Sequence, residues 1–320
     1  MAILVGIDEA GFGPILGPLV ISSTTFKIPR HLMKADLWQI LRNSVGNRRK
    51  QLAGRLLITD SKKAYNKSLG IKHIKRTTVA HLKCLGKNPT TLNELLTSLC
   101  SDCISRLKFY PWHQNTGNRC LAVDETDIAI ASDVLKLNLA SNDIKLLEMK
   151  SRCLDVKYYN QMITDVRNKA TVLFNATSQL IQSTFDNFAG DDDLQIIIDR
   201  QGGRTHYHRI LRRSFANTEL KILRESPTVS SYELKDNNKQ MCLHFVVGAD
   251  ERFLPVSLAS MTSKYLRELL IDNINQYFVS LHPNLKPTAG YWKDGLRFIE
   301  DVKKNIPHIQ FDNNQLIRCR

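Results

Sequence analysis

Two adjacent carboxylates near the start of the chain, Asp8 and Glu9, are the residues best placed for chemistry. They follow an apolar run, Ile3–Ile7, that is typical of a buried strand, and they precede a loop with three glycines at positions 11–17. Neighbouring side chains on a strand point to opposite faces, so both acids can serve one metal cluster only if the strand ends there and the loop redirects one of them. Glycines permit such a turn, and they let a polynucleotide backbone approach peptide N–H groups.

Two other interpretations of this stretch stay open from these residues alone. Acids before a glycine-rich turn are also an ordinary polar end of a strand. The spacing of Gly11, Gly13 and Gly17 also imitates a dinucleotide-binding turn, in which glycines seat a pyrophosphate at a helix N-terminus. The residues after Gly17, Pro18–Phe26, have the pattern of a second strand rather than a helix, which argues against a dinucleotide site.

Composition sets broad limits on the protein. A chain of 320 residues with 42% hydrophobic residues can build a real core in one large domain or two. Its net charge of +14 attracts polyanions, although a basic balance alone is also common in proteins that never bind nucleic acid. The chain shows neither a signal-peptide pattern nor an apolar run long enough to span a membrane, and its seven cysteines are spread widely. We expect reduced thiols and a protein that is cytoplasmic, or nuclear in a eukaryote, and not secreted.

Five blocks of sequence, in order, resemble the type 2 ribonuclease H family. The opening Asp8-Glu-Ala-Gly-x-Gly-Pro-x-x-Gly-Pro-Leu-Val is similar to the first block, and the others resemble the family's Asp-Ser-Lys-Lys segment, its third carboxylate strand, its Gly-Asp with the helix that follows, and its late Gly-Tyr. These four lie at Thr59–Lys63, Ile196–Asp199, Ala249–Arg267 and Gly290-Tyr291. The five blocks are spread between residues 8 and 291.

The resemblance implies a metal-dependent nuclease. Four carboxylates lie where a predicted strand ends or a loop begins: Asp8, Glu9, Asp199 and Asp250. We assign all four as catalytic metal ligands. Strands that neighbour one another in a sheet bring their ends together, so distance in sequence does not oppose a cluster. Hard oxygen ligands suit two Mg²⁺ or Mn²⁺ ions, which would support in-line hydrolysis of a phosphodiester. The implied products carry 5′-phosphate and 3′-hydroxyl ends.

Residues for substrate binding follow from the same blocks. Gly11, Phe12 and Gly13 stand where the family has Gly-Arg-Gly, a loop that reads the ribose 2′-hydroxyl through its backbone. Phe12 keeps the glycine geometry but cannot donate to a phosphate, so it either stacks on a sugar or base or packs inward. Tyr291 resembles the tyrosine that stacks on the sugar at the cleavage junction.

Cationic residues complete the predicted substrate site. Asp60-Ser61 has the pattern of a helix start, where Ser61, Lys62 and Lys63 would favour a phosphate of the substrate strand, although a plain N-cap with exposed lysines explains the pattern too. Lys264 lies on the long helix of the fourth block.

For the fold we expect an α/β protein with a ribonuclease H-like mixed five-stranded sheet flanked by helices, antiparallel at its start and parallel afterwards. Residues 1–250 would form the catalytic domain, with insertions near 86–145 and 204–242, and residues 251–320 a C-terminal helical region that closes the substrate groove. We expect a monomer that binds RNA–DNA hybrids or ribonucleotide-containing duplexes, with no membrane partner. Two rivals stay open: a nuclease of altered substrate, such as structured RNA or DNA, and a non-catalytic nucleic-acid-binding relative.

Overall fold

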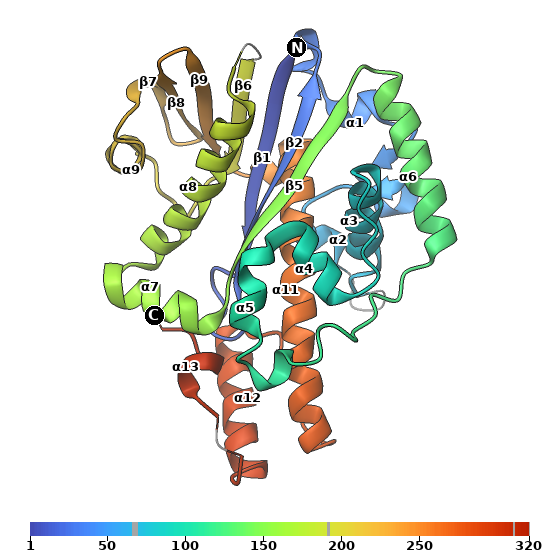
Figure 1. Ribbon diagram of the computed structural model, residues 1–320, viewed down its shortest axis with the longest axis vertical. Coiled ribbons are helices and arrows are strands. Elements are labelled where there is room, and N and C mark those ends of the chain that lie inside the picture. Colours follow the sequence, from blue (N-terminus) through green and yellow to red (C-terminus); the bar gives the residue numbers. More distant parts are fainter. Residues whose placement is uncertain (66–69, 191–192, 310, 320) are drawn as a thin grey trace.

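A seven-stranded sheet forms the centre of the computed structural model, which describes residues 1–65, 70–190, 193–309 and 311–319. The strand order is β5-β2-β1-β6-β9-β8-β7 (Figure 1). The strands β1, β6 and β9 run parallel, and every other pairing in this sheet is antiparallel. The strands are β1 (Ala2–Ala10), β2 (Leu19–Ile28), β3 (Val45–Gly46), β4 (Leu56–Leu57), β5 (Lys145–Leu154), β6 (Asp193–Asp199), β7 (Glu219–Glu225), β8 (Val229–Asp236) and β9 (Lys239–Val246), of which β3 and β4 form a separate parallel pair.

The predicted mixed α/β sheet, antiparallel first and then parallel, is confirmed, but it has seven strands rather than five. The difference arises in the segment predicted as the second insertion, 204–242. That segment supplies β7 and β8, which pair onto β9 and extend the sheet instead of standing apart from it.

Helices cover both faces of the sheet (Figure 1). The α-helices are α1 (Leu37–Ile40), α2 (Ser61–Ala64), α3 (Lys72–Cys84), α4 (Leu92–Cys100), α5 (Ile104–Leu107), α6 (Glu125–Ala140), α7 (Val156–Val166), α8 (Lys169–Phe188), α9 (His208–Ser214), α10 (Ala249–Arg252), α11 (Leu254–Leu281), α12 (Trp292–Asn305) and α13 (Asn313–Leu316). None of the helices in the described part of the chain is both long and apolar enough to cross a membrane.

The alternation of side chains along β1 divides the core in two. Ala2 and Leu4 belong to the cluster that contains α11, whereas Ile3, Val5 and Ile7 belong to the cluster that contains α8. A strand places successive side chains on opposite faces, so the uniformly apolar run predicted at the start of the chain is explained by burial on both sides.

The long helix α11 lies directly against β1. A Cβ atom at Gly6 would overlap the backbone of Pro255 and Val256, with the Pro255 carbonyl oxygen 2.6 Å away. Only a glycine allows this approach, so Gly6 sets how closely the first turn of α11 packs on the strand that carries Asp8 and Glu9.

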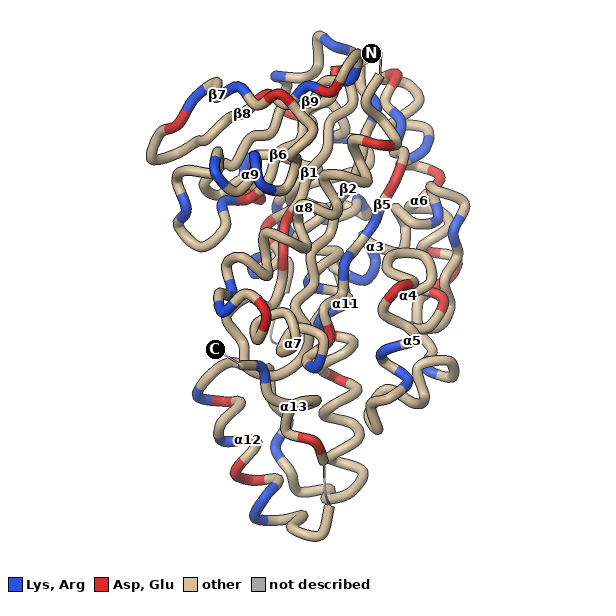
Figure 2. Tube along the Cα trace, turned by 60° about the vertical axis from the view of Figure 1, so that its left-hand side comes forward, with Lys and Arg blue, Asp and Glu red and all other residues tan. Residues whose placement is uncertain are grey.

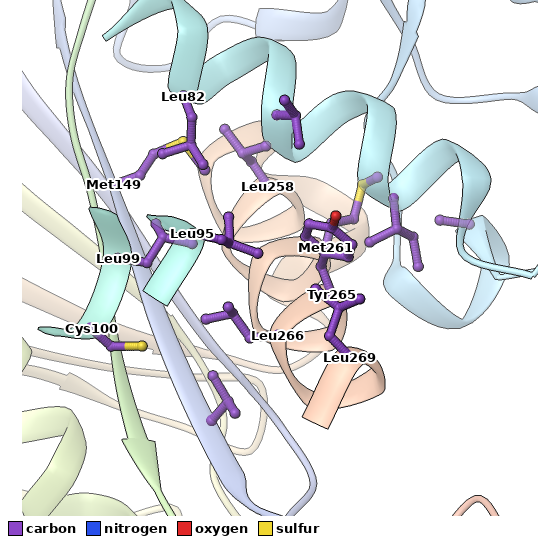
Figure 3. Packing of buried hydrophobic residues seen from close by; sticks show 14 of the residues in the cluster. Leu82, Leu95, Leu99, Cys100, Met149, Leu258, Met261, Tyr265, Leu266 and Leu269 are labelled. Carbon is purple, nitrogen blue, oxygen red and sulfur yellow. The ribbon is translucent and has the colours of Figure 1, made fainter. Parts of the chain in front are cut away.

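The segment predicted as the first insertion, 86–145, packs into the main core. Leu95 and Leu99 of α4 and Leu82 of α3 lie against Leu258 and Met261 of α11 (Figure 3). In the C-terminal region, α12 packs on the second half of α11, with the Phe278 and Phe298 ring centroids 5.5 Å apart. Both regions therefore brace α11, the helix that backs the predicted acidic residues.

Candidate active site

Parallel pairing of β1 with β6 brings two of the predicted acids together. The register matches Ile7 with Ile198, so the next residue on each strand, Asp8 and Asp199, comes at the same edge of the sheet. Parallel strands end on the same side, which is where ligands bind in sheets of this kind.

The third strand of this parallel set delivers Asp250. After β9 the chain turns at Gly248, whose φ of +61° lies in the left-handed region, and enters the short helix α10. The backbone N–H of Ala249 donates to Asp199 Oδ1 over 2.7 Å. This bond fixes the segment that carries Asp250 beside the end of β6.

Glu9 approaches the other three acids from the face of β1 opposite to that of Asp8. The strand does not end at the acids as the sequence suggested, because β1 continues through Ala10. Asp8 faces α11, where the Ser263 hydroxyl donates to its backbone oxygen over 3.0 Å, and Glu9 follows on the α8 side. The Glu9 N–H donates to Asp8 Oδ1 over 2.7 Å, so the Asp8 carboxylate folds back along the strand toward Glu9.

Electrostatics show that the four acids form one group, which we call the acid cluster. Burial raises the pKa of Asp8 well above its usual range, and the charges of Glu9, Asp199 and Asp250 raise it further. Burial also raises the pKa of Glu9 from 4.5 to about 8 and that of Asp250 to about 6, and in both cases the charge of Asp199 adds to the effect. The pKa of Asp199 is raised by burial and held back by backbone hydrogen bonds.

Serines of α11 connect the acid cluster to α2. The Ser260 hydroxyl donates to the Ser61 hydroxyl over 3.1 Å, and Ser260 also holds down the raised pKa of the Asp8 carboxylate. Ser263 also donates to Ser22 on β2 over 2.8 Å. Asp8 is therefore held by buried hydroxyls that keep its orientation.

The predicted cationic segment lies beside the acid cluster. Asp60 caps α2 by accepting from the Lys62 N–H over 2.9 Å, which confirms the helix start, and Lys62 lowers the pKa of Glu9, Asp199 and Asp250 through its charge. The Lys63 ammonium instead pairs with Glu251 at 2.6 Å. Lys62 is thus an exposed cation whose charge acts on three acids of the cluster, and the charge of Lys63 also interacts with Asp250.

The glycine loop after β1 has a defined geometry. Gly11 has a φ of +97°, and a Cβ there would lie 2.6 Å from the Pro18 carbonyl oxygen, whereas a Cβ at Gly13 would meet nothing within 4 Å. Phe12 is partly buried against the α8 side of the core, and the Lys169 ammonium lies 5.2 Å from the centre of its ring. Phe12 therefore packs inward, and a lysine from α8 brings a cation to the loop.

Lys264 and Tyr291 lie further along the same side of the molecule. Lys264 pairs with Glu268 at 2.7 Å, and Tyr291 is 52% exposed, so its ring is accessible to a ligand. Between them the buried Arg267 donates to the Ala289 carbonyl oxygen over 2.9 Å, and its guanidinium lies 5.6 Å from the centre of the Tyr291 ring. Arg267 holds the segment before α12 in place.

The donor set of the acid cluster fits a divalent cation. Among the described residues, no three His, Cys, Asp or Glu side chains are already arranged to enclose a metal ion. The acids are nevertheless buried, mutually repulsive and rich in hard oxygen donors, and a divalent cation would relieve that repulsion. The residues that would hold it are Asp8, Glu9, Asp199 and Asp250.

Several residues of the site carry no local signal in the sequence. Ser260 acts on Asp8 from α11, and Lys169 lies over the Phe12 ring from α8, so both come from helices far along the chain. Asp60 adds a fifth acid, whose charge raises the pKa of Asp199 and Asp250. Ser260 lies within Ala249–Arg267, the fourth block of the family resemblance, and that resemblance is the one feature that could have indicated it.

Comparisons with known proteins give low-identity structural neighbours. No protein-family model and no curated protein matches the chain. Among solved structures, Bst-RNase HIII in complex with Mn²⁺ aligns at a TM-score of 0.46 and 14% identity, covering 99% of this chain and 66% of that one. The RNase HII of Archaeoglobus fulgidus, solved in a complex with PCNA, aligns at a TM-score of 0.46 and 12% identity, covering 99% of this chain and 94% of that one. The ribonuclease H2 of Pyrococcus horikoshii aligns at a TM-score of 0.39 and 15% identity, covering 98% of this chain and 92% of that one.

These neighbours are ribonucleases H of the class that the five sequence blocks resemble. Their scores and identities carry no conclusion about activity, substrate or partner.

Proposed function

We propose that this protein is a divalent-cation-dependent endonuclease that hydrolyses the RNA strand of RNA–DNA hybrids, or ribonucleotides in duplex DNA. The observation that carries the proposal is the convergence of four carboxylates at the ends of β1 and β6 and just after β9, where Asp8 is buried, the other three are half-buried, and their charges raise one another's pKa. Buried like charges are costly to a fold, so their retention supports a bound cation at this position.

Asp8, Glu9, Asp199 and Asp250 would hold two Mg²⁺ or Mn²⁺ ions. Bound there, such ions supply a more acidic water and charge stabilisation for the departing oxygen. Ser260 and Ser263 orient Asp8 through its carboxylate and its backbone oxygen. The protein's part is to fix these donors before the substrate arrives, and the products carry 5′-phosphate and 3′-hydroxyl ends.

Substrate binding would use groups around the cluster. Lys62 offers its ammonium to a phosphate, because it has no ion-pair partner among the described residues, whereas Lys63 is engaged by Glu251. The open backbone at Gly13 can approach a ribose, and the exposed Tyr291 ring can stack on a sugar. Ser61 and Lys264 would support this surface through the Ser260 hydroxyl and the Glu268 pair.

The substrate preference depends on the glycine loop. Position 12 carries a phenylalanine that packs inward, so the loop lacks a side-chain donor and would read the 2′-hydroxyl through backbone groups alone. Lys169 brings a cation to the same loop and supports binding of a backbone phosphate. A nuclease of altered substrate is the second candidate, and the missing donor at position 12 is what favours it.

Defined duplexes distinguish the candidates. We would assay strands that contain one ribonucleotide, a short ribonucleotide run, all RNA or all DNA, each with Mg²⁺ or Mn²⁺, using Asp8→Asn as the inactive control. The proposal expects cleavage wherever RNA pairs with DNA and at least about a thousandfold loss in the control. Equal cleavage of the all-DNA duplex would defeat the hybrid preference, and no cleavage of any duplex would leave the non-catalytic alternative.

A further inference from the structure

A basic hollow of about 710 Å³ lies between the turn that joins α7 to α8 and the short helix α9. Arg204, Arg209 and Arg213 line it together with Thr171 and Asn175, and Asp165 is its one acidic residue. Figure 2 shows basic residues gathered on α9 and near this turn. The three arginines come from the segment 204–242, which none of the five sequence blocks covers.

The guanidinium groups of the hollow have no polar partner in the described part of the chain, although that of Arg204 lies over two aromatic rings. Across the described ranges of the chain, none of their three guanidinium groups makes an ion pair or a side-chain hydrogen bond. Arg209 and Arg213 are exposed, and Arg204 lies over the rings of Phe174 and Tyr207, at 6.0 and 5.7 Å from their centres. Unpaired guanidinium groups over a hollow with amide and hydroxyl donors suit phosphate oxygens.

Short stretches of chain connect the hollow to the glycine loop of the candidate active site. The chain runs from Asp199 through Gly202 and Gly203 to Arg204, and the Phe12 ring lies 3.8 Å from the position of a Cβ at Gly202. Lys169 begins α8 and lies over the Phe12 ring, two residues before Thr171 of the hollow. A row of cations therefore leads from the loop beside the acid cluster to α9.

We infer that this hollow is a subsite that binds the phosphodiester backbone of a nucleic acid beyond the bond that is cut. The inference rests on the proposed function, because it extends the substrate path from the acid cluster. Several separated guanidinium groups match successive phosphates of a polymer better than one small anion. The segment that adds β7 and β8 then has a function, because α9 directly precedes β7 in the chain and β7 is the edge strand of the sheet.

The test compares two variants that change net charge by the same amount. Arg209→Ala with Arg213→Ala removes two positive charges from the hollow, and Arg212→Glu changes the charge by two at an exposed residue of α9 that does not line it. Both are made in an Asp8→Asn background, so that a labelled RNA–DNA duplex stays intact during fluorescence anisotropy titrations. Circular dichroism and the melting temperature verify folding, which these exposed changes should preserve.

The inference predicts that the double variant binds about tenfold more weakly. The slope of log affinity against log salt concentration should become shallower by about 2, because two phosphate contacts are lost and each contributes about 0.9 to the slope. Arg212→Glu should change both far less. If the two variants share the same affinity and slope, the hollow contributes only net charge and the inference is overturned.

The two proposals fail separately. Cleavage by the wild-type protein, with duplex binding unaffected by the double variant, would overturn the subsite and leave the nuclease. A protein that cleaves no duplex but shows the predicted loss and the shallower slope would overturn the nuclease, while the hollow would remain a binding site for a phosphodiester backbone.

Discussion

Removing one charge from the acid cluster should stabilise the protein while it abolishes activity. Asp8 is 6% exposed, and its pKa is raised by burial and by three neighbouring acids. Asp8→Asn keeps the volume of the side chain and an oxygen that accepts from the Glu9 N–H, but it removes a buried negative charge. Without divalent cations, the free energy of unfolding at pH 8 should therefore rise.

The pKa of Glu9 sets the scale of this effect. It is raised from 4.5 to about 8, so between these values the native protein keeps a proton that the unfolded chain has released. The unfolded state then binds fewer protons, and stability falls as the pH rises from about 4.5 to about 8. At 1.36 kcal/mol for each pKa unit the full shift corresponds to at most about 5 kcal/mol. That shift comes from burial and from the charges of Asp199 and Asp250, whereas the repulsion between Asp8 and Glu9 contributes to the raised pKa of Asp8. Because Asp8→Asn removes this repulsion, we expect it to recover about 1 to 2 kcal/mol.

Urea unfolding in the presence of EDTA, followed by circular dichroism at several pH values from 5 to 8, measures this directly. Asp133→Asn, at an exposed acid of α6, serves as the control and should follow the wild type. Adding Mg²⁺ should reverse the order, since the wild type gains about 2.7 kcal/mol at a hundredfold excess over its dissociation constant. The reasoning is refuted if wild-type stability is flat from pH 5 to 8 in EDTA, or if Asp8→Asn is less stable at pH 8.

Three further predictions follow from packing and exposure. Gly6→Ala should lower the free energy of unfolding by about 3 kcal/mol or more, because the new methyl group would overlap the backbone of α11. Gly13→Ala should change it by less than about 1 kcal/mol, because a Cβ there meets no atom within 4 Å. Urea unfolding compares the two variants, and equal losses of stability would contradict the packing argument. Arg267→Ala should cost about 3 kcal/mol or more in the same assay, because it empties a buried volume and leaves the Ala289 carbonyl oxygen without its donor, although Glu268 keeps its pair with Lys264; a loss below about 1 kcal/mol would count against that. Tyr291→Ala should raise the KM for a hybrid duplex about tenfold while Tyr291→Phe leaves it near the wild-type value, a difference that steady-state kinetics would reveal.

The elements of the site could be predicted because their signals are local. The apolar runs at Ile3–Ile7 and Ile196–Ile198 mark strands buried on both faces, and the acid at the end of each run lies at a strand exit in the structure. The cap formed by Asp60 is also local, since a carboxylate two residues before a backbone N–H needs no distant partner. The domain boundaries and the oligomeric state stay predictions.

The remainder of the site depends on contacts between distant segments, which no local pattern contains. The sequence could not show that Lys169 would cover Phe12, that Arg267 would be 1% exposed beneath Tyr291, or that β7 and β8 would extend the sheet. The exact end of the first strand also depends on a distant partner, because pairing with β2 carries β1 one residue beyond Glu9, to Ala10. Each of these features is decided by which elements meet in three dimensions.

The same helix explains how such a costly cluster is kept in place. At Gly6 the first turn of α11 packs against β1 without an intervening side chain, so Ser260 and Ser263 reach Asp8 across a fixed distance. The free energy gained by burying α11 on the sheet and under α3 and α4 offsets the repulsion among the acids (Figure 3). The helix that contributes most to the core is therefore also the one that orients Asp8. Loosening its packing should lower stability and misplace the carboxylates together, whereas changes on α9 should weaken binding of nucleic acid alone.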